Sequence, residues 1–306
     1  MKNLHERDTV DMPLLKPPGA ERPRPYSSLV RVELAGLSDV GRVRANNEDH
    51  FLVVRFSRAI DSLITNLPAG TVPAQAAEVG YGMVVADGVG GSAGGEVASR
   101  LAIQTLFNLA VSIPDWIMLP DSELTTEIMR RAGERYQQIS TVLAEEAQAD
   151  PDLRNMATTM TLAWSMGADL YVAHLGDSRA YLFHDGALRQ LTRDHTLAQA
   201  MADRGEIAPE QVARNRLRHV LMQSLGANQC NVEPDIDRYE LASGDYLLLC
   251  SDGLTDMVRD DIIASVFALK ESAEAACRRL VDLALEAGGR DNVTVVVARY
   301  HLPDTP

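Results

Sequence analysis

Short apolar runs with strand composition recur along most of the chain, and each one ends at a charged or glycine-containing turn. The first, at 30–34, alternates apolar with charged residues, as a half-buried strand does. Asp185-Gly186 and Gly167-Ala168 stand between neighbouring runs, where hairpin turns belong. We therefore expect a largely antiparallel sheet. Its further strands are the runs at 51–54, 81–86, 159–165, 170–175, 179–183, 187–191, 238–241, 246–250 and 292–300.

Other segments repeat their apolar residues at helical spacing. Hairpins combined with long helices predict an α+β fold, in which sheets pack together and helices cover them. This order of elements fits neither a Rossmann fold nor an α/β-hydrolase. The expected helices run from Glu96 to about Pro114, from about Glu123 to Ala147 with Asp121 or Ser122 as the cap, and over 197–203, 260–269 and 273–287.

Three segments fall outside the periodic pattern. Residues 1–28 are rich in proline and predict an extended, flexible N-terminal arm. Residues 55–80 contain Pro68, Gly70 and Pro73, and predict an inserted loop with at most one helical turn. The periodic region, 29–301, is expected to form one domain, and 302–306 a C-terminal tail.

Composition excludes several classes of protein. The chain of 306 residues has a net charge of −14, which argues against nucleic-acid binding. It has no run of 18 apolar residues and no apolar signal core, so neither a membrane span nor secretion is expected. Its three cysteines, Cys230, Cys250 and Cys277, lack metal-type spacing and predict buried thiols in a reducing compartment.

The run at 81–86 ends at Asp87, and a glycine-rich loop joins it to the next helix. Glycines let the backbone come close to whatever binds there. Gly88-x-Gly90 with Ala93 fits a dinucleotide-binding loop, but the acid expected for the ribose is missing from 101–114. Ser92 fits a hydrolase elbow, but lies well beyond the strand end. A third interpretation makes Asp87 a metal ligand.

Other acids favour the metal interpretation. Each sits where an apolar run meets a turn, and carboxylates at one sheet edge can converge on hard divalent cations. One such acid is an ordinary turn residue, but repetition at five junctions is harder to explain by turns alone. The junctions hold Glu48-Asp49, Asp87, Asp177, Asp252 and Asp291.

These acids belong to motifs that stand in a familiar order. The motifs are Arg44-x-x-Asn47-Glu48-Asp49, Asp87-Gly88-x-Gly90-Gly91, Ala157-Thr158-Thr159, Gly176-Asp177-Ser178-Arg179, Ser251-Asp252-Gly253-Leu254 and Gly289-x-Asp291-Asn292. Over 30–300 the chain resembles the metal-dependent protein phosphatases of the 2C type, and its spacing suits bacterial members. The resemblance implies a central antiparallel β-sandwich flanked by α-helices on both sides.

The resemblance also implies a centre of two Mn²⁺ or Mg²⁺ ions at one edge of the sandwich. By matching position, Asp87 bridges the two metals and the Gly88 carbonyl binds one of them. Asp252 and Asp291 bind the other. Asp177, with help from Asp252, matches the ligand of a third, weaker metal. Such ions prefer oxygen ligands, as the residue types here allow.

Three further residues receive roles from the resemblance. Glu48 and Asp49 would hold metal-bound waters. Arg44 would bind the substrate phosphate, for which its planar fork of donors is suited. Phosphate esters of serine and threonine would then be hydrolysed by a hydroxide that bridges the metals.

Two positions depart from the family pattern. Val89 stands where many eukaryotic members have a histidine proposed as general acid, so a water would have to protonate the leaving group. Ala157 replaces a usual glycine, which we interpret as tolerated because Thr158 and Thr159 remain. None of the seven histidines has zinc-ligand spacing, so surface or supporting roles are expected for them.

The chain is thus expected to be a cytoplasmic, monomeric phosphatase that acts on phosphorylated substrates of a serine/threonine kinase. The alternative is a catalytically silent relative that binds phosphoproteins. Residues 191–231 match the flap beside the active site in bacterial members. The basic cluster Arg214–His219 falls in this flap region, and Arg216 and Arg218 are expected to help dock an anionic substrate.

Overall fold

The computed structural model describes residues 27–72, 74–89, 94–112, 121–226 and 232–303. Nearly all of the predicted N-terminal arm, Cys230, and the last residues of the C-terminal tail lie outside these ranges. Gly90 to Ala93, on which the dinucleotide and elbow interpretations depend, lie outside them as well.

Two sheets form the centre of the molecule, and every pair among the described strands is antiparallel, as predicted. The five-stranded sheet has the order β1 (Arg31–Asp39), β12 (Val293–His301), β11 (Tyr246–Cys250), β7 (Arg179–His184), β8 (Ala187–Gln190). The seven-stranded sheet has the order β10 (Asp235–Glu240), β6 (Asp169–Leu175), β5 (Met160–Met166), β3 (Gln75–Val89), β4 (Ala157–Thr158), β9 (Leu225–Gly226), with β2 (Asp49–Asp61) on β3.

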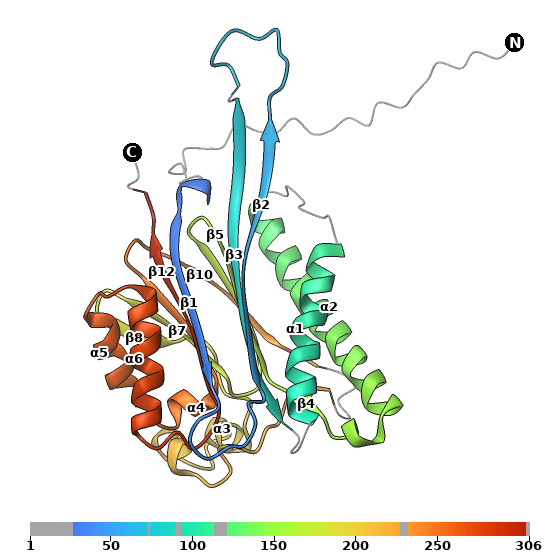
Figure 1. The fold of residues 1–306 in the computed structure, drawn as a ribbon, viewed down its shortest axis with the longest axis vertical. Helices are drawn as coiled ribbons and strands as arrows, with labels where there is room; N and C mark the ends of the chain where they lie inside the picture. The colour runs from blue at the N-terminus through green and yellow to red at the C-terminus, as the bar shows by residue number, and fades with distance from the viewer. Residues whose placement is uncertain (1–26, 73, 90–93, 113–120, 227–231, 304–306) are drawn as a thin grey trace, which may run out of the picture.

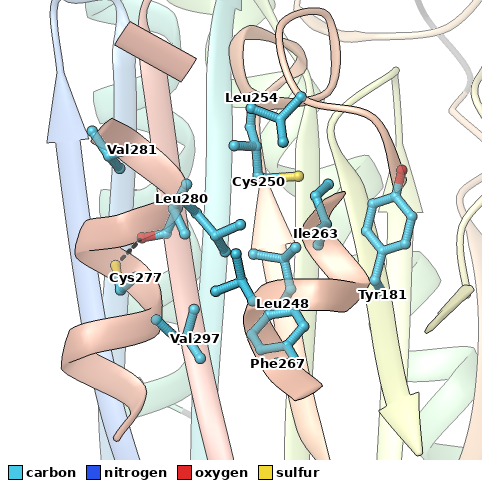
Figure 2. Close-up of a cluster of buried hydrophobic side chains, with 14 of the residues drawn as sticks. Tyr181, Leu248, Cys250, Leu254, Ile263, Phe267, Cys277, Leu280, Val281 and Val297 are labelled. Carbon is cyan, nitrogen blue, oxygen red and sulfur yellow. Dashed lines mark hydrogen bonds between the residues drawn. The ribbon is translucent and has the colours of Figure 1, made fainter. Parts of the chain in front are cut away.

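Strand alternation divides the buried residues among three layers. In β11, Leu247 and Leu249 face the other sheet, whereas Leu248 and Cys250 face outward. Helices α5 (Asp260–Ala268) and α6 (Ala273–Glu286) cover that outward face, as Figure 2 shows. Helices α1 (Gly94–Ser112) and α2 (Asp121–Ala149) cover the outer face of the other sheet (Figure 1). The predicted sandwich with helices on both sides is therefore confirmed.

Side-chain caps mark the start of two helices. Helix α3 (Leu197–Asp203) begins at Thr196, whose hydroxyl accepts a hydrogen bond from the Gln199 amide, and α6 begins at Ser272 in the same way. These are the boundaries that the sequence predicted, to within one residue. A short helix, α4 (Asp252–Thr255), was not predicted. In the described ranges, 3₁₀ turns occupy Ser27–Leu29, Pro151–Leu153 and Pro209–Arg214.

The prediction of a loop at 55–80 is wrong. Strands β2 and β3 continue through most of this segment and pair up to Asp61 and Gln75. The segment that connects the two strands is therefore limited to 62–74. Because β5 pairs with β3 only over 80–85, the outer part of the hairpin extends beyond the sheet as a two-stranded arm (Figure 1). Leu63 and Ile64 are exposed near its tip, and the described residues between the two strands form no helical turn. The two strands stabilise each other by pairing, which single-strand periodicity does not reveal.

None of the helices in the described ranges combines the length and the apolar character that a membrane crossing requires.

Candidate metal and phosphate site

Six carboxylates meet at one end of the sandwich, which we call the acid edge: Glu48, Asp49, Asp87, Asp177, Asp252 and Asp291. It lies opposite the two-stranded arm, where β2 begins, β3 ends and α4 begins (Figure 1). All the acids that the sequence predicted for the site are therefore close together.

Asp49 and Asp87 are direct partners in the β2–β3 register. Residues directly opposite on antiparallel strands project to the same side, so the two carboxylates point the same way. Burial raises the pKa of Asp87 well above its usual range, and neighbouring carboxylates raise it further. Those neighbours, in order of effect, are Asp49, Asp252, Asp177 and Asp291.

Asp49 is held from the opposite sheet. The Ser251 hydroxyl donates to Asp49 Oδ2 at 2.6 Å and accepts from the Thr294 amide at 3.0 Å. Burial raises the pKa of Asp49 to about 7, although the side-chain hydrogen bonds of Ser251 and Thr294 to the carboxylate oppose the rise. Ser251 thus joins the end of β11 to the start of β2, and places Asp252 beside Asp49.

Backbone contacts fix the end of β3. The Thr158 hydroxyl and the Thr159 amide both donate to the Asp87 carbonyl, at 2.8 and 2.9 Å. Thr159 Oγ1 accepts from the Asp87 amide at 3.1 Å. Ala157, the departure from the usual glycine, pairs with Val89 in the register of β3 and β4 and leaves these contacts in place.

Gly88 packs where no side chain fits. A Cβ there would lie 2.2 Å from the Gly95 carbonyl oxygen, on the first turn of α1. The Gly88 amide donates to the Glu48 carbonyl at 3.2 Å, and the Ser99 hydroxyl donates to the same oxygen at 2.6 Å. The glycine therefore brings α1, β3 and the segment before β2 into contact at the acid edge.

Asn292 anchors the loop that carries Arg44 and Glu48. Its side-chain amide donates to the carbonyls of Val40 and Asn46 at 2.9 Å each, and its oxygen accepts from the Glu48 amide at 2.8 Å. The sequence analysis included Asn292 in a motif but assigned it no role. That role could not be found from local sequence, because its partners lie more than 240 positions away.

Arg44 lies at the mouth of the site. Its Nη2 donates to Asp291 Oδ2 at 2.6 Å, and 56% of its side chain is exposed. The hydrogen bond and the charge of Asp291 raise the pKa of Arg44, so the guanidinium remains charged. A cation beside the acids, open to solvent, can bind an incoming phosphate.

His219 is the residue that sequence reasoning missed. Its Nδ1 lies 3.3 Å from Asp252 Oδ2 and its Nε2 3.3 Å from Asp256 Oδ2. Ligand atoms of Asp177, His219 and Asp252 all lie within 4.8 Å of one another, which is close enough for a cation. Local spacing could not find this histidine, because its nearest acid in the group is 33 positions away in sequence.

Of the cysteines in the described ranges, neither Cys250 nor Cys277 takes part in the site. Cys250 and Cys277 are buried between the five-stranded sheet and its helices, where the Cys277 thiol donates to the Val295 carbonyl (Figure 2). Burial raises the pKa of each thiol to about 12, so neither is a thiolate near neutral pH.

Comparison with known proteins agrees with this geometry. The profile of the protein phosphatase 2C family matches residues 72–284. The chain is 39% identical over 264 residues to the serine/threonine protein phosphatase PstP of Mycobacterium tuberculosis, covering 86% of this chain but 44% of that protein. It therefore spans less than half the length of this relative. It is 33% identical to the serine/threonine phosphatase Stp of Listeria welshimeri, covering 72% of this chain and 84% of the other.

A solved structure of the PstP catalytic domain, described as a complex with two manganese ions, superposes with a TM-score of 0.68. It shares 34% sequence identity, and the match covers 89% of this chain and 99% of that one. Its strands and helices are thus arranged as they are here.

Proposed function

Since the chain belongs to the protein phosphatase 2C family, we propose that it is a metal-dependent phosphatase that hydrolyses phosphoserine and phosphothreonine in proteins. The observation that carries the proposal is the meeting of carboxylates from both sheets at the acid edge, beside the exposed Arg44. So much close negative charge is tolerable when hard cations are bound.

We propose that two Mn²⁺ or Mg²⁺ ions are held by Asp87, the Gly88 carbonyl, Asp252 and Asp291. The donor set fits these ions, since it consists of oxygens alone. Burial raises the pKa of Asp87 most, and nearby carboxylates, Asp49 first, raise it further, which supports the assignment because carboxylates this close can share a cation. When bound, such ions lower the pKa of a coordinated water and offset the charge of the reacting phosphate.

The remaining residues position the reactants. Arg44 would bind the phosphate oxygens through its fork of donors. Glu48 and Asp49 would orient water at the site, with Asn292 and Ser251 holding them through the contacts above. Val89, at the end of β3, has no proton to give, so water would protonate the departing serine or threonine oxygen.

We also propose a cytoplasmic, monomeric enzyme that opposes a serine/threonine kinase in signalling. The buried free thiols of Cys250 and Cys277 support a reducing compartment. The resemblance to bacterial serine/threonine phosphatases supports phosphorylated proteins as the substrates. The net charge of −14 supports the absence of nucleic-acid partners.

The test is turnover of a phosphothreonine peptide while Mn²⁺ is titrated into protein stripped with EDTA. We expect metal-dependent hydrolysis, and a loss of about 100-fold or more in kcat for Asp87→Asn and Asp252→Asn, because each change removes a charged ligand. Asp185→Asn is the matched control, since Asp185 is an exposed acid in a distant hairpin turn.

Near-normal turnover in either site variant would overturn the metal assignment. No turnover by the wild-type protein at any Mn²⁺ concentration, with a normal circular dichroism spectrum, would favour the silent, phosphoprotein-binding relative instead.

A further inference from the structure

The group formed by Asp177, His219 and Asp252 draws on three distant parts of the chain. Asp177 follows β6, Asp252 begins α4, and His219 comes from the flap region, 191–231. Ligands at about 2.0–2.3 Å from one ion lie at most about 4.6 Å from each other. Since the three ligand atoms already lie within 4.8 Å of one another, a shift of a few tenths of an ångström would bring all three onto one cation.

The Asp177 carboxylate lacks a partner. The residue is only 8% exposed, yet its carboxylate accepts no hydrogen bond and forms no ion pair within the described ranges. The nearby guanidinium of Arg179 is already occupied, because it donates to Asp194 at 2.8 and 2.7 Å. A buried carboxylate that accepts no hydrogen bond is costly, so binding of a cation from outside the chain would stabilise this one.

The backbone presents His219 toward Asp177. The segment just after it is hydrogen-bonded to the start of α3, from the Leu197 amide to the Val220 carbonyl at 2.8 Å and from the Met222 amide to the His195 carbonyl at 2.7 Å. The His195 amide also donates to the Gly176 carbonyl at 2.7 Å. The connector 195–197 therefore holds both His219 and the turn that carries Asp177.

His219 has no strong competing contact. Both its nitrogens lie 3.3 Å from a carboxylate oxygen, which is beyond the usual length of a charge-assisted hydrogen bond. Arg218, the preceding residue, pairs with Asp256 at 3.0 Å, so the segment stays attached to α4 when the imidazole turns to another partner.

We propose that His219 is a nitrogen ligand of a cation that Asp177 and Asp252 also hold, so that this cation fastens the flap region to the acid edge. The inference rests on the proposed function, because Asp252 is also a proposed ligand of the two catalytic metal ions. An imidazole ligand favours Mn²⁺ over Mg²⁺, which prefers an all-oxygen shell. Loading of the site should therefore be selective for Mn²⁺, and should reduce the mobility of the flap region.

The direct test is electron spin echo spectroscopy of the full chain loaded with Mn²⁺, which detects a ¹⁴N nucleus bound to the metal. We expect nitrogen modulation in the wild-type protein, since the other proposed ligands are oxygens. His219→Gln should abolish it and weaken the weakest class of Mn²⁺ sites about tenfold in calorimetry, by loss of one ligand. His184→Gln, which removes a histidine at the far end of β7, should change neither.

Trypsin gives a second readout, because Arg214 and Arg216 lie in the flap region. Mn²⁺ should slow cleavage at these sites in the wild-type protein and not in His219→Gln. Absence of nitrogen modulation in the fully loaded wild-type protein, or its persistence in His219→Gln, would overturn the inference.

Turnover of an aryl phosphate by the same samples separates the two hypotheses. Turnover without nitrogen modulation overturns the His219 ligand alone. Nitrogen modulation without turnover supports the ligand and overturns the proposed phosphatase activity.

Discussion

At the acid edge, the residue type at several positions is dictated by atoms of neighbouring segments rather than by the strand or helix to which the residue belongs. A Cβ at Gly253 would lie 1.9 Å from the Asn292 carbonyl oxygen, so α4 can approach β12 only with glycine there. Gly176 has φ of +115° and faces the Thr159 side chain, where a Cβ would lie 2.5 Å away. These glycines let acids from separate strands come together.

His184 illustrates a residue whose protonation contributes to stability. Its Nδ1 lies 2.7 Å from Asp245 Oδ1, and that hydrogen bond raises the pKa of His184 above its ordinary 6.5. A raised pKa in the folded state stabilises the protein below the unfolded pKa, and the benefit is lost as pH rises through the folded value. We expect His184→Gln to lower Tm more at about pH 5.5 than at about pH 8.5. Thermal unfolding at both pH values checks this, and an equal change in Tm would contradict it.

At the scale of elements, the arm and the flap region are the parts least supported by the sandwich. In the arm, β2 and β3 contact each other beyond the end of β5, and the tip exposes apolar side chains. In the flap region, only short elements occur between α3 and β9, with a 3₁₀ turn at Pro209–Arg214.

The arm should be dispensable for folding. Ser57 and Val79 are direct partners, so an Asn-Gly turn can join them in place of 58–78. We expect turnover of an aryl phosphate to stay within about twofold and Tm to fall by less than about 5 °C, because no core side chain is removed. Kinetics and thermal unfolding of the shortened chain measure both. A large fall in Tm would mean that the arm supports the sandwich.

Arg216 and Arg218, both expected from the sequence to help dock substrate, lie in different surroundings in the flap region. Arg216 is exposed and has no ion pair in the described part of the chain, whereas Arg218 pairs with Asp256. Arg216→Glu should raise KM severalfold for a phosphopeptide and much less for an aryl phosphate. Of the two substrates, only the phosphopeptide is long enough to extend from the metal site to the flap region. Arg218→Glu should affect both substrates by disturbing the flap. Equal effects of Arg216→Glu on the two KM values would argue against docking.

At the scale of the whole molecule, the core between the sheets is what holds the two halves of the site in register. Asp49 and Asp87 belong to β2 and β3, and Glu48 directly precedes β2, whereas Asp252 and Asp291 lie beside the ends of β11 and β12. The Tyr300 hydroxyl donates to Ser165 across the sandwich at 3.1 Å. Apolar packing between the sheets supplies most of the remaining contact.

Substitutions in the core between the sheets should therefore lower the free energy of unfolding. Leu247 is fully buried between the sheets, so Leu247→Ala should lower the free energy of unfolding by about 2–5 kcal/mol through lost burial and a cavity. The same change at Leu63, which is 87% exposed, should stay within about 0.5 kcal/mol. Urea unfolding of both variants makes the comparison, and similar midpoints would contradict the assignment of the core.

The sequence by itself determined the approximate positions of most strands and of the longer helices in the body of the molecule, though not of β4, β9 and α4, and it identified the acids at the strand ends. It could do so because burial of one strand face or one helix stripe is recorded in neighbouring residues, as in β8 and α6. The order of motifs then indicated the family and the metal chemistry.

Tertiary structure alone decided the length of the β2–β3 arm, the roles of Ser251 and Asn292, and the place of His219. Each depends on partners far away in sequence: Ser251 contacts Asp49, Asn292 contacts Glu48, and His219 lies beside Asp252. Periodicity shows which face of a strand is buried, but not which distant segment covers it. That information exists only once the chain has folded and the two sheets have packed together.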